Sequence, residues 1–206
     1  MGIHKPTAPS ATFAGYPDNV VENNSATLYK SNVFYPCLEG RATPQSANVN
    51  ASANYLRVVP FVTRAAFSID ALCVFNTDTG QSGTKARFGI YGVSATSAID
   101  NLIAETGELT LDSSMALRAV SITETALTGG TLYFLAMVSN NNFSCAKASS
   151  AGGNRDGNFG DWLQMSGLAS NSYPAFYKAH TYGALPDPFG TIVGGADGAR
   201  LGVLAV

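Results

Sequence analysis

The residue types that most often carry nucleophilic or acid–base catalysis are sparse in this chain. It contains two histidines, and His4 lies in a Pro-containing N-terminal stretch. A Ser/His/Asp or Cys/His centre would therefore depend on His180, whose position between Tyr177 and Tyr182 is more typical of a structural or surface histidine. The sequence has no phosphate-binding loop, dinucleotide fingerprint, nucleophile elbow or H-E-x-x-H motif. We predict that the chain is not an enzyme and has no catalytic residues.

A stretch rich in Gly, Asn and Ser, residues 140–160, is the first candidate for a recognition loop. Asp156, Asn158 and the following Asp161 offer closely spaced oxygen ligands, but no glutamate completes an EF-hand pattern. Turns require the same residue types, so a turn is favoured over a calcium site. Loops of this length are uncommon unless they bind a partner or move. We predict no metal or other cofactor, and take Asn154 and Asp156 as candidate binding residues.

The densest aromatic stretch of the chain surrounds its single tryptophan, Trp162. The stretch comprises Phe159, Trp162, Tyr173, Phe176, Tyr177 and Tyr182. Aromatic rings beside amides and carboxylates suit a protein interface or a ring-shaped polar ligand such as a sugar, and core packing explains them as well. The candidate ligand- or partner-binding residues of this stretch are Phe159, Trp162, Tyr173 and Tyr177.

The charge of the chain argues against several kinds of partner. Lys and Arg total 12 against 14 Asp and Glu, so no basic footprint for nucleic acid or an anionic membrane is present. No apolar run approaches the ~20 residues that a membrane-spanning helix needs. The first residues of the sequence also lack the apolar region of an export signal, so none is predicted. Charged residues make up 13% of the chain, against ~25% in typical soluble domains. This shortage favours a surface that is covered in an assembly, although a merely uncharged polar coat explains it too.

The three cysteines are predicted to be free thiols. Cys37, Cys73 and Cys145 lie far apart and have no zinc-site spacing. An odd number argues against a secreted disulfide framework and favours a protein made in a reducing cytoplasm.

From about Asn54 the sequence changes to short β-rich runs separated by turn-forming clusters, which is typical of a sandwich or barrel. Because side chains alternate across a strand, one face of the run 67–75 is predicted to lie in the core. That face comprises Phe67, Ile69, Ala71, Cys73 and Phe75. The other predicted strands are 85–93, two short strands within 102–111 separated by Gly107, 115–127, 131–139 and 199–206.

The run 131–139 is predicted to be a central strand, since both of its faces are apolar. One face carries Leu132, Phe134, Ala136 and Val138, and the other carries Tyr133, Leu135 and Met137. We expect one face inside the sandwich and the other against a partner subunit. In 85–93, Phe88 and Ile90 share one face, while Arg87, Tyr91 and Val93 share the other.

Residues 1–53 are predicted to form an extended arm for docking and assembly. Their composition, rich in Pro, Ala, Ser, Asn and Thr, cannot bury enough apolar surface to fold alone. A loosely ordered terminus explains this composition equally well. The aromatic residues that would anchor the arm on a neighbouring molecule are Phe13, Tyr16, Tyr29, Phe34 and Tyr35. Residues 54–206 are then the β-sandwich domain.

Four stretches together give the chain a resemblance to bacteriophage tail-fibre and virion-appendage proteins. They are Arg87-Phe-Gly-Ile-Tyr91, Leu102-Ile-Ala-Glu-Thr-Gly107, Gly130-Thr-Leu-Tyr-Phe-Leu-Ala-Met-Val-Ser139 and Tyr182-Gly-Ala-Leu-Pro-Asp-Pro-Phe-Gly190. The resemblance covers residues 54–206. It implies that these stretches are strands of a jelly-roll-like sandwich, that the protein is a homotrimer, and that it sits on a virion as a fibre tip, baseplate element or head decoration.

We therefore expect an all-β protein, an antiparallel β-sandwich of jelly-roll-like form with an extended N-terminal arm. The expected function is a virion structural protein, made in the host cytoplasm, that attaches a phage to its host through multivalent contacts. Its expected partners are copies of itself, other virion proteins and a host surface glycan. Head decoration or a head fibre is the alternative. A free carbohydrate-binding module is the competing class, and a glycan-degrading enzyme is third, although neither an export signal nor paired acids support these two.

Overall fold

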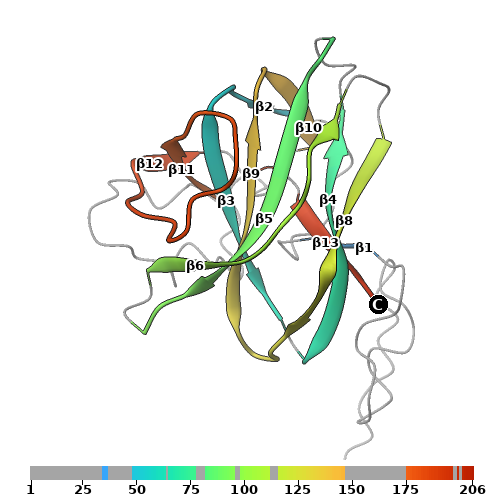
Figure 1. The fold of residues 1–206 in the computed structure, drawn as a ribbon, viewed down its shortest axis with the longest axis vertical. Coiled ribbons are helices and arrows are strands. Elements are labelled where there is room, and N and C mark those ends of the chain that lie inside the picture. The colour runs from blue at the N-terminus through green and yellow to red at the C-terminus, as the bar shows by residue number, and fades with distance from the viewer. Residues whose placement is uncertain are drawn as a thin grey trace, which may run out of the picture.

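The fold is known from a computed structural model, which describes residues 34–36, 48–63, 65–77, 82–95, 98–111, 116–146, 175–196, 199 and 201–206. All secondary-structure elements in this part of the chain are β-strands, and they form two sheets (Figure 1). All strand pairs are antiparallel. The prediction of an all-β antiparallel sandwich is confirmed.

The two sheets divide the strands between them. Sheet A consists of β1 (Phe34–Pro36), β2 (Asn48–Ala51), β4 (Phe67–Asn76), β8 (Ala116–Leu127), β10 (Phe143–Ala146) and β13 (Leu201–Ala205). Sheet B consists of β3 (Tyr55–Val62), β5 (Lys85–Val93), β6 (Ile99–Glu105), β7 (Leu109–Thr110), β9 (Leu132–Ser139), β11 (Ala175–Ala179) and β12 (Gly194–Ala196). The predicted strand runs match β4, β5, β6, β7, β8, β9 and β13.

The order of the strands is that of a jelly roll. Sheet A contains the succession β2-β10-β4-β8, and sheet B contains β3-β9-β5-β6. Numbered from one to eight along the chain, these strands are ordered 1-8-3-6 and 2-7-4-5, which is the double Greek key of a jelly roll. The strands β1 and β13 extend sheet A, and β11 and β12 extend sheet B beyond β3.

Two strands fall within residues 1–53, the region predicted to be an arm. β2 pairs with β10 from Asn48 to Ala51, and β1 pairs with β13 from Phe34 to Pro36. Ala51 is buried in the core. The first strand of the jelly roll therefore lies before residue 54. A strand of four residues with two asparagines has too little apolar alternation to be recognised from sequence.

The core between the sheets is built largely from the predicted faces. Phe88 and Ile90 of β5 and Leu135 and Met137 of β9 lie in it, together with Val59 of β3. Glycine at position 107 separates β6 from β7, as expected. Packing of these apolar side chains between two sheets is the main source of stability in a sandwich of this kind.

The predicted core face of β4 is right at its start and wrong beyond Ile69. Ile69 lies in the core, but Leu72 and Val74 follow it there. The reason is a bulge in β4, since Ala71 pairs with Leu204 while Ile69 pairs with the very next residue, Ala205. An extra residue on one strand reverses which side chains face inward beyond it. On the opposite side of β4 lie Ala71, Cys73 and Phe75, of which Ala71 and Cys73 are buried, as predicted, but outside this core cluster.

The outer face of sheet B is covered by the same chain. Residues 180–193, here termed the covering segment, join β11 to β12 and lie over this face (Figure 1). Leu185 and Phe189 of this segment pack with Phe134, Ala136 and Val138 of β9 in a second buried cluster. The prediction that a partner subunit covers this face of β9 is therefore wrong. The stretch 182–190, which the resemblance implied to be a strand, is irregular backbone.

Candidate functional site

Asn54 holds the covering segment at its start. Its backbone oxygen accepts a hydrogen bond from the N–H of His180 at 2.9 Å, and its side-chain Oδ1 accepts one from the N–H of Tyr182 at 2.8 Å. Its own N–H donates to the Ser139 oxygen at 2.9 Å. Asn54 has a φ of 59°, a left-handed conformation that asparagine adopts more readily than most residues. Three bonds and a special backbone conformation make this a rigid point of the surface.

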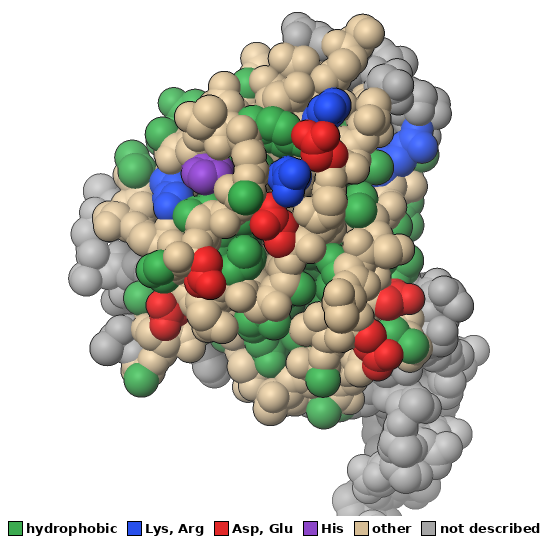
Figure 2. All heavy atoms as spheres, in the orientation of Figure 1, with side chains coloured by type: hydrophobic (Ala, Val, Ile, Leu, Met, Phe, Trp, Pro, Cys, Tyr) green, Lys and Arg blue, Asp and Glu red, His purple; other side chains and the backbone are tan. Residues whose placement is uncertain are grey.

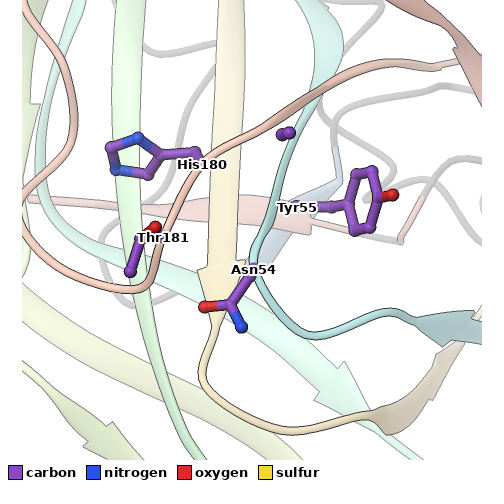
Figure 3. A pocket seen from close by; sticks show the side chains of 5 residues that line it. Asn54, Tyr55, His180 and Thr181 are labelled. Atoms are coloured by element: carbon purple, nitrogen blue, oxygen red, sulfur yellow. The ribbon is translucent and has the colours of Figure 1, made fainter.

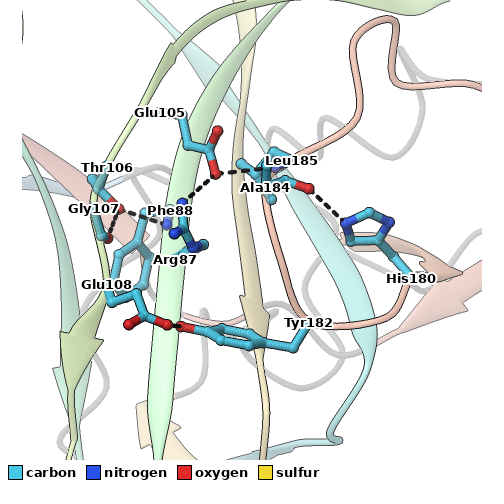
Figure 4. Close-up of polar contacts among 10 residues, drawn as sticks. All are labelled: Arg87, Phe88, Glu105, Thr106, Gly107, Glu108, His180, Tyr182, Ala184 and Leu185. Carbon is cyan, nitrogen blue, oxygen red and sulfur yellow. Dashed lines mark hydrogen bonds and ion pairs between the residues drawn. The ribbon is translucent and has the colours of Figure 1, made fainter.

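Two glutamates tie the middle of the covering segment to sheet B (Figure 4). Glu105 Oε1 accepts hydrogen bonds from Arg87 Nη1 at 3.2 Å and from the Leu185 N–H at 3.0 Å. Glu108 accepts from Lys85 Nζ at 3.0 Å and from the Tyr182 hydroxyl at 2.9 Å. Each carboxylate thus binds one cationic side chain of β5 and one hydrogen-bond donor of the covering segment, and so links the segment to the sheet.

These contacts shift two ionisations. Burial, followed by the hydrogen bond to Glu108, raises the pKa of Tyr182 to about 12. Hydrogen bonds from Lys85 and then from Tyr182 lower the pKa of Glu108 below its ordinary value. The two shifts widen the pH range over which Tyr182 is neutral and Glu108 is charged, which is the pairing their hydrogen bond requires.

The far end of the covering segment is anchored by aromatic and backbone contacts. Phe189 meets Tyr91 edge to face with ring centroids 5.2 Å apart, and its N–H donates to the Asp100 oxygen at 2.9 Å. Lys178 Nζ lies 4.9 Å from the Phe189 ring centroid and donates to the Phe189 carbonyl oxygen. Burial lowers the pKa of Lys178. The segment is thus part of the folded domain along its whole length.

A hollow lies where β3 begins and β11 ends. It is lined by Asn54, Tyr55, Ala179, His180 and Thr181 (Figure 3). Tyr55 and Ala179 are paired across the two strands, so the hollow sits on the rim of sheet B. None of these five described residues is a carboxylate, lysine or arginine. The polar groups of its described lining are an amide, an imidazole and a hydroxyl, contributed by Asn54, His180 and Thr181.

The ring of Tyr55 is exposed and has an aromatic neighbour. Its side chain is 40% exposed, and its ring centroid lies 5.6 Å from that of Tyr177 at an interplanar angle of 71°. Tyr177 was among the predicted binding residues, and the structure brings it to this rim. Tyr55 was not predicted, because a single tyrosine at the start of a β-rich run has the same appearance as a core residue. Only the pairing of β3 with β11 identifies it.

The other predicted site residues of the aromatic stretch and the recognition loop lie outside the described residues. They are Asn154, Asp156, Phe159, Trp162 and Tyr173. The same is true of the arm residues Phe13, Tyr16 and Tyr29. Phe34 and Tyr35 lie in β1, where they pair with Leu204 and Val203.

His180 has a backbone oxygen as its neighbour. Its Nε2 lies 3.0 Å from the carbonyl oxygen of Ala184 (Figure 4).

Within the described ranges, no group of three or more His, Cys, Asp and Glu is placed to hold a metal ion. The same ranges contain no helix long and apolar enough to cross a membrane. The prediction that the chain is not an enzyme stays a prediction.

The charged side chains of the surface are few and mixed in sign. Figure 2 shows a few acidic and basic groups on one face of a largely uncharged surface, with some of the opposite charges side by side near the upper centre and other acidic groups apart from them. Two of the opposite-charge pairs are Lys85 with Glu108 and Arg87 with Glu105.

No protein-family model matches this chain, and no curated protein matches it.

Proposed function

We propose that this protein is a structural component of a bacteriophage particle, an appendage of the tail-fibre or baseplate type that attaches the particle to its host. The observation that carries the proposal is the strand order 1-8-3-6 and 2-7-4-5 of an antiparallel jelly roll. This architecture recurs in viral capsid domains and in lectins, whose shared property is a rigid sandwich that presents its loops to a partner. The fold supports the class by analogy, and the sequence resemblance narrows it.

The surface composition supports attachment within an assembly. Charged residues make up 13% of the chain, and on the described surface Lys85 pairs with Glu108 and Arg87 with Glu105. Such a surface steers no polyanion, so nucleic acid and membranes are not proposed as partners. Several copies on one particle, with a trimer as the proposed unit, would convert weak single contacts into firm attachment.

Head decoration is the second candidate, and it has less support than the sequence suggested. The arm and an apolar outer sheet face were the two features expected to grip a capsid. The covering segment already buries that face, because Leu185 and Phe189 occupy it. Residues 1–33 remain the part of the chain that we propose for docking to another virion protein.

A free carbohydrate-binding module shares the fold and is the competing class. It differs in location, because such a module would be absent from the particle. Gold-labelled antibody against the full chain, applied to purified intact particles, separates these alternatives by electron microscopy. We expect label at the tail or baseplate. Label confined to the head would favour decoration, and unlabelled particles would refute a virion role.

A further inference from the structure

Strand β8 lies at one end of sheet A and has an edge to which no described strand is paired. It pairs with β4, and the part of the chain that the structure describes contains no second partner for it (Figure 1). About half of the N–H and C=O groups of an edge strand point away from its neighbour, where they can bond to another extended strand. We propose that this edge pairs with the same edge of a second copy of the chain, with the two β8 strands antiparallel.

The covering segment closes the corresponding edge of sheet B. Strand β6 is at the end of that sheet, and its Asp100 oxygen accepts a hydrogen bond from the Phe189 N–H at 2.9 Å. The N–H of Leu102, also on β6, donates to Asp187 Oδ1 at 3.0 Å. The protein thus caps the edge of β6 with its own chain, whereas the described residues provide no such cap for β8.

Strand β8 also lacks the features that usually protect an edge strand. Natural edge strands are often short, or carry proline or lysine. β8 contains neither residue and, with 12 residues, is the longest strand of the described ranges. Its pairing with β4 is irregular between Ser121 and Thr125, and a bulge of this kind interrupts regular pairing. The regular edge that is open to a second copy is therefore 116–121.

The side chains of this edge point to two different surroundings. Val120 packs against the core between the sheets. The residues that alternate with it are exposed on the outer face of sheet A, namely Leu117, Ala119 and Ser121. A two-fold axis that relates two antiparallel strands of one sheet stands perpendicular to that sheet. Exposed residues of one copy must therefore lie opposite exposed residues of the other.

Charge decides between the registers that remain. Arg118 is the one charged residue of the regular edge, and an axis at this residue would place two arginines directly opposite each other, which destabilises a sheet. An axis at Ala119 instead places Arg118 opposite Val120. It also places Leu117 opposite Ser121, so no like charges face each other. The expected contact is a two-fold pair centred on Ala119, which is additional to the proposed trimer and independent of a virion role.

Sedimentation equilibrium of the full chain over a range of concentrations tests this pairing. We expect a complex with an even number of chains, whether or not trimers form as well. Ala119→Lys places two lysines opposite each other at the axis and should raise the Kd of the two-fold association about tenfold or more. Ala179→Lys is the matched control, because Ala179 is an exposed alanine on β11 of the other sheet. Its association should equal that of the parent protein.

Cross-linking tests the register without a change of charge. Cβ atoms directly opposite each other in an antiparallel pair lie about 4.5 to 5.5 Å apart. The background is Cys37→Ser, since the other two cysteines, Cys73 and Cys145, are buried. In this background a short bifunctional thiol reagent should join Ala119→Cys, but not Ala179→Cys, into covalent dimers. A single chain at all concentrations, a complex with an odd number of chains, an association that Ala119→Lys leaves unchanged, or equal cross-linking of the two cysteine variants would each overturn the inference.

Discussion

The side-chain oxygen of Asn54 accepts a hydrogen bond from the backbone N–H of Tyr182 at 2.8 Å, joining residues 128 positions apart. This contact places the start of the covering segment directly beside the first residues of β3. The hydrogen bond thereby helps to hold the covering segment over the outer face of sheet B, where Leu185 and Phe189 are buried.

Substitution of Asn54 separates its hydrogen bond from its backbone conformation. Asn54→Gly loses the side-chain bond but tolerates a φ of 59°, and should reduce the free energy of unfolding by about 1 kcal/mol. Asn54→Ala also strains the backbone and should cost about 2 to 3 kcal/mol. Urea unfolding of both variants measures the difference. Equal losses would show that the left-handed conformation contributes nothing.

Removal of the Phe189 ring tests the covering segment. Phe189 is fully buried against Tyr91, so Phe189→Ala should lower the free energy of unfolding by about 3 to 5 kcal/mol. Val193, in the same segment, is 67% exposed, and Val193→Ala should change the free energy of unfolding by less than about 0.5 kcal/mol. Thermal and urea unfolding provide the comparison. A Phe189→Ala protein as stable as Val193→Ala would contradict the burial of sheet B by this segment.

Two glycines outside the site differ in what surrounds them. A Cβ on Gly129 would lie 2.8 Å from backbone atoms of Ala65, whereas one on Gly107 would meet nothing within 4 Å. Gly129→Ala should therefore cost about 1 to 3 kcal/mol, because backbone must move to make room. Gly107→Ala should be neutral or slightly stabilising. The denaturation midpoints of the two variants provide the comparison. A Gly129→Ala protein more stable than Gly107→Ala would show that the turn before β9 is packed differently.

The thiol of Cys73 should be inert in the native protein. Burial, and then the nearby charge of Asp70, raise the pKa of Cys73 to about 12. Only about 10⁻⁴ of such a thiol is ionised at pH 8, and the thiolate is the reactive form. In a Cys37→Ser background, a thiol-specific reagent should label neither Cys73 nor Cys145 until denaturant is added, since both are buried. Rapid stoichiometric labelling of Cys73 at pH 8 would refute this burial.

Tyr182 predicts how stability depends on alkaline pH. Burial and the hydrogen bond to Glu108 raise the pKa of Tyr182 to about 12, from an ordinary value of 10.0. The folded state therefore holds this proton more tightly than the unfolded state. The resulting stability is fully present below pH 10 and is lost as the pH rises toward 12.

Tyr182→Phe isolates this contribution. The variant should lose less stability than the parent protein between pH 10 and pH 12, and its absorbance titration should lack one late-ionising tyrosine. Chemical unfolding at a series of pH values provides the first measurement, and ultraviolet difference spectra provide the second. Identical profiles for the two proteins would place Tyr182 in solvent rather than in the network with Glu108.

Much of the fold could be predicted from the alternation of side chains. In β5 and β9 each face has its own apolar set, and both sets are buried as the pattern requires. In β4 the same reasoning fails beyond Ile69, because a bulge shifts the pattern by one residue and leaves no mark in composition.

The covering segment shows a second limit of sequence patterns. Leu185 and Phe189 stand among prolines and glycines without helical or strand periodicity, so the segment has the composition of a turn. Its place over sheet B depends on long-range bonds such as those made by Glu105 and Tyr91. Likewise Tyr177 could be proposed from its aromatic surroundings, whereas Tyr55 becomes a candidate only when the two strands are seen side by side.

The most direct test of the attachment function is the rate at which intact particles adsorb to host cells in the presence of antibody fragments against this chain. Monovalent fragments avoid cross-linking of particles, and fragments against an unrelated virion protein serve as the control. The proposed function predicts that adsorption slows in proportion to the labelled fraction of the chain. Full labelling of the particles with an unchanged adsorption rate would contradict it.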